Sequence, residues 1–170
     1  MSPQVRRALL TLHVATSVGW LGAIVAYIAL NVPALGSTDE QTARAAYLMM
    51  EPVFRYAVVP LGVTALVTGV AQSLGTPWGL FRHYWVTISL ATTAFANLVM
   101  IAHIPEVQHL AAVAGDPDAR VDELGGDLLH AIGGLVLLLV PLVLNIYKPR
   151  GLTRHGWRAT RKTVTTGSTL

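Results

Sequence analysis

Two of the six histidines in this 170-residue chain are placed where they could share one ligand. His103 closes the third of four long apolar blocks and His130 opens the fourth, so consecutive antiparallel helices would carry both imidazoles at the same depth. Bis-histidine ligation of a b-type haem needs this arrangement, because the macrocycle slips between two helices and takes an axial nitrogen from each. His103 and His130 are therefore the first candidate cofactor site.

The same pair could instead hold a metal ion. Glu106 and His109 follow His103 closely in the connection to the fourth block, and either side chain could bend back toward the pair. With one of them added, the group offers nitrogen and oxygen ligands for zinc or copper. The alternative without a cofactor is that both histidines are interfacial side chains that hydrogen-bond to water or to the acidic loop.

A second pair of histidines marks a candidate inner site. His13 lies in the first apolar block, on the opposite side of the membrane from the first pair, and His83 is the only imidazole near it. On a helix, His13 heads a polar stripe that also holds Thr16, Ser17, Trp20 and Tyr27. The alternative is a buried His13 that hydrogen-bonds to Thr16, Ser17 or a carbonyl of its own helix.

Membrane-spanning helices must position these side chains. Hydrophobic residues make up 53% of the chain and charged residues only 12%. A hydrocarbon core of about 30 Å needs roughly 20 helical residues, and four apolar blocks have this length: 8–30, 56–74, 84–104 and 128–147. Isolated apolar blocks satisfy their backbone hydrogen bonds in lipid as helices. The sequence therefore predicts an all-α fold, a bundle of four transmembrane helices.

Charge predicts the orientation of the bundle. Nine of the twelve Lys and Arg lie in the N-terminus, the second connection and the tail, whereas all nine acids lie in the first and third connections. Basic residues near span ends stay on the cytoplasmic side, so both termini should be cytoplasmic in a bacterial plasma membrane. Residues 1–150 form the predicted transmembrane domain, and 151–170 a basic, largely disordered cytoplasmic tail that can rest on anionic lipid. Nothing else in the chain resembles a nucleic-acid module.

The first connection contains an amphipathic outer segment before the second span. Thr38 and Gln41 have the spacing of a capping box, which predicts a helix start there. Glu51 and Arg55 have the spacing of an ion pair on one helix. One face of the predicted helix collects Ala43, Ala46, Tyr47 and Met50. Pro52 and Pro60 should bend the segment.

The first span also carries a stripe of small residues opposite its polar stripe, formed by Ala15, Gly19, Gly22, Ala23 and Ala26. Such a surface suits close packing against another helix, within the bundle or in a homodimer. The spans contain no nucleophile–base arrangement and no phosphate-cradling glycine loop, and the chain has no cysteine. These observations disfavour hydrolase and nucleotide-dependent functions, and they leave open whether the protein is an enzyme.

The stretches "LHVATSVGWLGAIVAYIAL", "LGTPWGLFRHYWV" and "YKPRGL" resemble a family of small, uncharacterised four-helix membrane proteins common in actinobacteria, over residues 5 to 154. This resemblance implies no activity. The first helix is also similar to that of copper-resistance D-type membrane proteins and HemJ-type protoporphyrinogen oxidases. These similarities imply copper handling or haem-related redox chemistry, with His13 in the role of their helix-one histidine.

The leading hypothesis is an integral membrane protein that binds haem b or a metal ion, copper or zinc, through histidines at helix ends, with a redox or metal-handling role. A second hypothesis is a cofactor-free membrane scaffold or assembly partner that works through the small-residue stripe and the acidic outer loop. A copper-resistance-like permease is the third.

Overall fold

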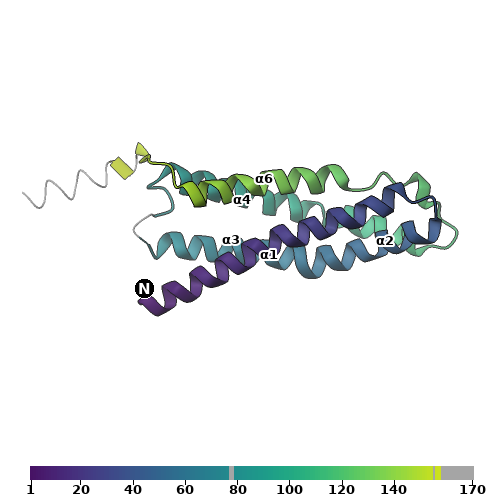
Figure 1. Ribbon diagram of the computed structural model, residues 1–170, viewed down its shortest axis with the longest axis horizontal. Helices are drawn as coiled ribbons and strands as arrows, with labels where there is room; N and C mark the ends of the chain where they lie inside the picture. The colour runs from purple at the N-terminus through teal and green to yellow at the C-terminus, as the bar shows by residue number, and fades with distance from the viewer. Residues whose placement is uncertain (77–78, 155, 158–170) are drawn as a thin grey trace, which may run out of the picture.

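The computed structural model describes residues 1–76, 79–154, 156 and 157, and the regular structure of this part is helical (Figure 1). The long helices are α1 (Pro3–Gly36), α2 (Glu40–Val53), α3 (Val59–Leu74), α4 (Tyr84–Ala102), α5 (Ile104–Gly115) and α6 (Leu128–Tyr147). A π-helix, η1 (Phe54–Val58), joins α2 to α3, and a short 3₁₀ turn, η2 (Val121–Glu123), lies before α6. The chain folds as an antiparallel helix bundle.

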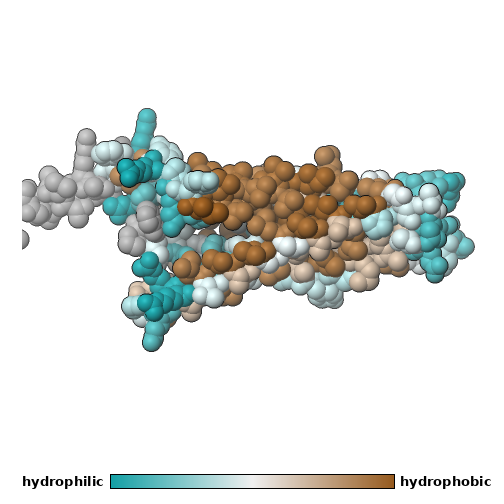
Figure 2. All heavy atoms as spheres, in the orientation of Figure 1, coloured by the Kyte–Doolittle hydropathy of each residue, from teal (hydrophilic) through white to brown (hydrophobic). Residues whose placement is uncertain are grey.

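The prediction of four helices long and apolar enough to span a membrane is confirmed in the described part of the chain. Four continuous helical stretches are long and apolar enough to cross a bilayer: Pro3–Gly36, Glu40–Leu74, Tyr84–Gly115 and Leu128–Tyr147. Three of them extend beyond the predicted apolar blocks 8–30, 56–74 and 84–104. Figure 2 shows, on the face in view, an apolar band across the middle of the bundle with hydrophilic residues at both ends. The cytoplasmic location of the termini stays a prediction.

Two ends of the bundle can be distinguished by what they contain. At one end α1 begins and α6 stops, and we call this the termini end (Figure 1). At the other end lie α2, α5 and the connection 116–127 between α5 and α6, and we call this the loop end. The helix α1 packs mainly against α3 and α2, and α4 packs mainly against α6.

Small residues let α1 and α3 approach closely. A Cβ atom at Gly62 would lie 2.7 Å from the indole of Trp20, so the ring fits there only because Gly62 has no side chain. Gly19 packs on Leu61 in the same interface, but Ala15, Gly22 and Ala26 of the predicted stripe are exposed. The stripe is therefore only partly covered by this chain, and a homodimer through the remainder stays a prediction.

The segment before the second span is a helix that continues directly into that span. Its buried residues are Ala43, Ala46, Tyr47 and Met50, the four predicted to share a face. The predicted capping box is wrong, because Asp39 rather than Thr38 caps the helix. Hydrogen bonds from the Thr42 hydroxyl and amide lower the pKa of Asp39, which favours the charged form at the helix N-terminus.

Two prolines flank the irregular part of this long helix. The π-helical turn Phe54–Val58 lies between Pro52 and Pro60, and a proline removes a backbone donor from the regular α-helical ladder. The turn presents Phe54 and Val58 to the core. The predicted ion pair between Glu51 and Arg55 is confirmed, at 3.3 Å.

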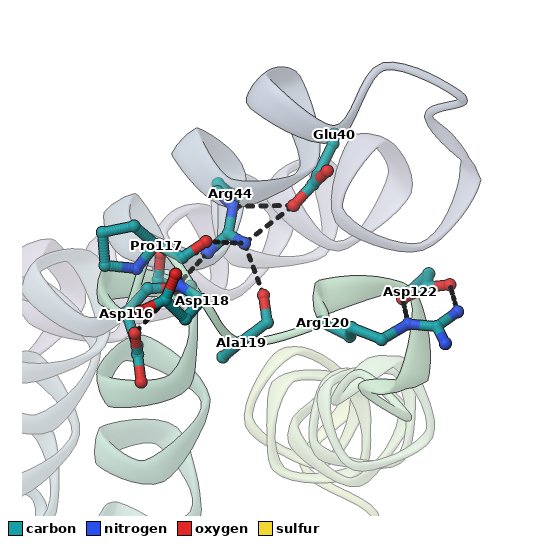
Figure 3. Close-up of polar contacts among 9 residues, drawn as sticks. Glu40, Arg44, Asp116, Pro117, Asp118, Ala119, Arg120 and Asp122 are labelled. Carbon is teal, nitrogen blue, oxygen red and sulfur yellow. Dashed lines mark hydrogen bonds and ion pairs between the residues drawn. The ribbon is translucent and has the colours of Figure 1, made fainter.

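Arg44 of α2 holds the beginning of the connection between α5 and α6 (Figure 3). Its guanidinium pairs with Glu40 at 2.7 Å, and its side chain is only 18% exposed. The same group donates to four backbone carbonyls, those of Ala114, Asp116, Pro117 and Ala119. One guanidinium thus hydrogen-bonds to a carbonyl at the C-terminal end of α5 and to carbonyls of the following loop, and so fixes the path of that loop.

The first residues of the predicted tail pack on the connection between α3 and α4. Leu152 forms an isolated bridge with His83, and the backbone amide of Thr153 donates to the carbonyl of Arg82 at 3.0 Å. Residues 158–170, where most of the predicted disorder falls, lie outside the described residues.

We expect Arg44→Ala to destabilise the loop end. The substitution leaves four backbone carbonyls without this donor, and those of Asp116 and Pro117 are at exposed contacts where water can replace it. The loss should therefore correspond to one or two hydrogen bonds from a charged group at about 1.5–3 kcal/mol each, or roughly 2–4 kcal/mol. Thermal unfolding of the protein in detergent measures the loss. The matched control is Arg120→Ala, an exposed arginine of the same loop that pairs only with exposed acids, and it should leave the melting temperature nearly unchanged. Equal effects of the two substitutions on the melting temperature would contradict the role given to Arg44.

Candidate functional site

Asp127 is the centre of a polar cluster at the loop end. The residue is 3% exposed and directly precedes α6. Its Oδ2 accepts a hydrogen bond from the hydroxyl of Tyr27 at 2.7 Å, and its Oδ1 lies 2.7 Å from Nε2 of His103. A buried carboxylate is stable only when it is paired and hydrogen-bonded, and both oxygens of Asp127 have partners.

The backbone of Asp127 is fixed as firmly as its side chain. Its amide donates to Oδ1 of Asn31 at 3.0 Å, and Nδ2 of Asn31 donates to the carbonyl of Tyr27. Asn31 is completely buried. Tyr27 and Asn31 stand one turn apart on α1, so a single helix face holds both the side chain and the backbone of Asp127.

Local sequence explains how Asp127 reaches this position. Gly126 has a φ of +61°, a left-handed conformation that favours glycine, and a Cβ there would lie 2.5 Å from Leu35. Asp127 occupies the N-cap position of α6, yet its carboxylate makes no capping hydrogen bond to that helix. The side chain is turned instead toward α1 and α4, which is unusual because an N-cap Asp normally accepts from its own first turn.

The predicted pair of His103 and His130 is brought together. Their rings stack with centroids 4.3 Å apart and an interplanar angle of 25°. Phe54 makes an edge contact with His103, with ring centroids 6.4 Å apart and an interplanar angle of 68°. The His103 side chain is 13% exposed, whereas the His130 side chain is 58% exposed. The cluster therefore has a closed side and an edge that faces the surroundings.

His103, Asp127 and His130 could hold one metal ion. One ligand atom from each lies within 4.8 Å of the other two. Metal bonds of about 2.0–2.2 Å in a tetrahedron place ligand atoms roughly 3.4 Å apart. Nδ1 of His130 is 3.5 Å from Oδ1 of Asp127 and already fits this separation. His103 is closer, at hydrogen-bond distance, so an ion would have to replace that hydrogen bond.

The other predicted members of the outer site are not in this cluster. Glu106 and His109 lie on α5 with exposed side chains, and Asp127 supplies the carboxylate in their place.

The stacking of the two imidazoles disfavours a haem bound between them. Axial haem ligands lie on opposite faces of the macrocycle, and stacked rings leave no space for a macrocycle between them. A metal ion fits the observed arrangement better.

The predicted inner pair is placed on different parts of the bundle. Nδ1 of His13 donates to the carbonyl of Ala65 at 3.0 Å and lies 3.1 Å from the hydroxyl oxygen of Thr68, so His13 bonds across to α3 and not to its own helix. His83 precedes α4, where its backbone bridges to Leu152 and its ring lies beside Trp85. A shared site for His13 and His83 stays a prediction.

Sequence reasoning missed three members of the polar cluster: Tyr27, Asn31 and Asp127. Tyr27 was visible only as part of the polar stripe of the first span, and Asp127 as one acid of the outer loop. A usable signal exists, because Tyr27 and Asn31 have helical i,i+4 spacing and Asp127 lies three residues before His130. No pattern within the sequence, however, links residue 31 to residue 127.

Comparison with known proteins gives no further assignment, since no protein-family model, curated protein or solved structure matches this chain.

We expect Gly126→Ala to disturb the cluster through the backbone of Asp127. A Cβ at this position forces a left-handed residue against Leu35, with an expected cost of about 1–3 kcal/mol. Gly125→Ala is the matched control, because the neighbouring glycine is exposed and a Cβ there meets nothing within 4 Å. Thermal unfolding in detergent should show a loss for the first variant only. A fully stable Gly126→Ala protein would contradict the described backbone.

Proposed function

We propose that this protein binds a divalent transition metal ion, zinc in the first instance, through His103, Asp127 and His130 at the loop end of a four-helix membrane bundle. The observation that carries the proposal is the convergence of two imidazoles and a carboxylate, with their ligand atoms within 4.8 Å, from the end of α4 and the start of α6. The group combines the two predicted histidines with a buried acid.

The choice of ion follows from the donor atoms. Imidazole nitrogens suit zinc and copper, and one carboxylate with two imidazoles is a ligand set that zinc uses when a fourth position stays open. Thiolate ligands, which would favour Cu(I), are absent because the chain has no cysteine. Cu(II) would compete for the same nitrogen and oxygen atoms, because it generally binds such sites more tightly than zinc.

The residues around the cluster leave it open to a metal ion on one side only, the side of His130. Tyr27 and Phe54 lie on its closed side, while the exposed His130 faces outward. Tyr27 donates to the second carboxylate oxygen of Asp127, and partners of this kind orient metal ligands. We infer that the ion arrives from the loop side of a bacterial plasma membrane, taken as the outer side, and that the role is metal handling. Haem ligation and a cofactor-free scaffold are the competing functions.

We expect purified protein stripped of metal to bind one Zn²⁺ per chain, and His130→Ala to weaken this binding at least tenfold. His130 is the sharpest variant, because its side chain is mostly exposed and its removal should leave the fold intact. Isothermal titration calorimetry gives the stoichiometry and the dissociation constant. Titration with Co²⁺ adds visible absorption bands that report a tetrahedral nitrogen and oxygen site.

The matched control is His109→Ala, an exposed histidine of the same end that lies outside the cluster. It should bind Zn²⁺ as the unmodified protein does. Equal loss from both histidine variants would indicate dispersed surface binding and contradict the site. A Soret band in the purified protein that disappears in His130→Ala would instead favour haem, and protein that binds neither metal nor haem would favour the scaffold.

A further inference from the structure

A cleft opens into the bundle at the termini end, and no residue of the metal cluster lines it. Its volume is about 490 Å³, within the range of about 300–1,000 Å³ that small-molecule sites occupy. Residues of α1, α3, α4 and α6 line it, and the start of α1 lies apart from the end of α6 at this end (Figure 1). Along α1 the lining extends from Arg6 to Leu21, about 22 Å at about 1.5 Å per residue. The cleft is therefore long enough for a lipid-soluble ligand.

The wall of the cleft is largely apolar and carries no acid. Most of the lining residues are Leu, Val, Ile or Ala, and no Asp or Glu is among the described residues that line it. Arg6 lies at the mouth, near the start of α1. A cationic ligand would therefore meet a positive charge and no carboxylate. The wall suits a neutral ligand with a long apolar part.

His13 offers a hydrogen-bond acceptor to this cleft. Its Nδ1 lies 3.0 Å from the carbonyl of Ala65, and because a carbonyl only accepts, Nδ1 carries the proton. The neutral ring then has a lone pair on Nε2, which makes no hydrogen bond within the described part of the chain. The ring turns its other edge to α3, since a Cβ at Gly69 would lie 3.0 Å from Cε1 and 3.8 Å from Nε2. Nε2 is thus the unused nitrogen of a partly exposed side chain that lines the cleft.

Ser17 adds a hydroxyl beside this acceptor. It follows His13 by one helical turn on the same face of α1 and also lines the cleft. Helical Ser and Thr often donate to the carbonyl four residues earlier, as Thr16 does to Leu12. The hydroxyl of Ser17 makes no such bond among the residues that the structure describes. A ligand hydroxyl next to this pair can donate to Nε2 and accept from Ser17, whereas a ligand carbonyl would face the lone pair of Nε2.

Asn145 offers a second acceptor from α6, on another wall of the cleft. Its Nδ2 donates to the carbonyl of Pro141 at 2.6 Å and lies 3.5 Å from the hydroxyl oxygen of Ser89. Because the carbonyl of Pro141 only accepts, this side of the amide must be the nitrogen. Oδ1 is therefore left as an acceptor, and it makes no hydrogen bond within the described residues. A neutral ligand with two separated hydroxyls can donate to α1 and to α6 at once.

We propose that this cleft binds a membrane quinol. One ring hydroxyl donates to Nε2 of His13 and accepts from Ser17, the other donates to Oδ1 of Asn145, and the hydrocarbon chain lies along the apolar wall. A phenolic hydroxyl is more acidic than that of an alcohol and is therefore a stronger donor. The oxidised quinone has carbonyls in place of both hydroxyls and supplies no donor, so the site selects the reduced form. The proposal does not rest on the metal site, which lies at the other end of the bundle.

The experiment is isothermal titration calorimetry of the full-length protein in detergent under nitrogen. The probes are decylubiquinol, decylubiquinone and the dimethyl ether of decylubiquinol, which keeps the reduced ring but has no hydroxyl. Monoolein is the fourth probe, because its two hydroxyls are neighbours on a flexible chain. We expect one decylubiquinol to bind per chain, at least tenfold tighter than each of the other three probes.

Two substitutions of His13 separate its two nitrogens. The amide nitrogen of His13→Asn lies near the position of Nδ1 and keeps a donor toward Ala65, but no atom replaces Nε2. Its affinity for decylubiquinol should fall at least tenfold. His13→Gln places its amide near the position of Nε2 and should retain most of the affinity. Asn145→Leu removes Oδ1 at similar volume and should weaken binding about fivefold.

The matched controls lie on the same helix outside the cleft. Thr11→Val removes a hydroxyl from an exposed position that does not line the cleft, and it should leave binding unchanged. Ser17→Trp fills the cleft and should abolish decylubiquinol binding, whereas Leu12→Trp, on an exposed face of α1, should not.

Four results would overturn the proposal. Equal affinity for decylubiquinol and its dimethyl ether would show that the hydroxyls are not recognised. Equal affinity for monoolein would show that the cleft accepts lipid hydroxyls in general and not a quinol ring. An undiminished affinity in folded His13→Asn protein would remove His13 from the site. Unchanged binding in folded Ser17→Trp protein would show that decylubiquinol binds outside the cleft.

Discussion

The buried carboxylate of Asp127 is the constraint on which the loop end depends. A carboxylate removed from water must be paired, and breaking such a pair costs about 3–5 kcal/mol because the remaining charge is left uncompensated. Tyr27 and His103 provide the partners, so the positions of α1, α4 and α6 must agree with one another to within hydrogen-bond distance. Between helices in lipid, where apolar packing alone gives little discrimination, these polar contacts set the register of the bundle.

The other contacts of the loop end serve this arrangement. Arg44 gathers the carbonyls that follow α5, the hydroxyl of Tyr47 donates to the carbonyl of Leu124, and the left-handed Gly126 turns the chain into α6. Each contact restricts the conformation of the loop. The carboxylate of Asp127 therefore has a fixed position although it belongs to a loop, and a ligand site requires side chains held in fixed positions.

The same atoms of the polar cluster have a structural role and a proposed role as metal ligands. Without an ion, His103 and Asp127 share a hydrogen bond that ties two helices. A metal ion would replace that bond with two coordinate bonds and recruit His130, whose ring already stacks on His103. Metal binding would then be linked to the stability of the loop end, because the ion binds atoms that hold the folded state together. The cleft at the termini end stands apart from this linkage.

The sequence by itself determined the class of the fold. Four apolar blocks of membrane-spanning length predicted four helices, and the antiparallel order of consecutive blocks brought His103 near His130, because these facts depend only on length, periodicity and connectivity. Only the tertiary structure decided that Asp127 completes the cluster in place of Glu106 or His109, that Asn31 and Tyr27 hold it, and that His13 bonds to α3. These contacts join residues up to 100 positions apart, and their formation depends on helix register and loop path, which no local pattern encodes.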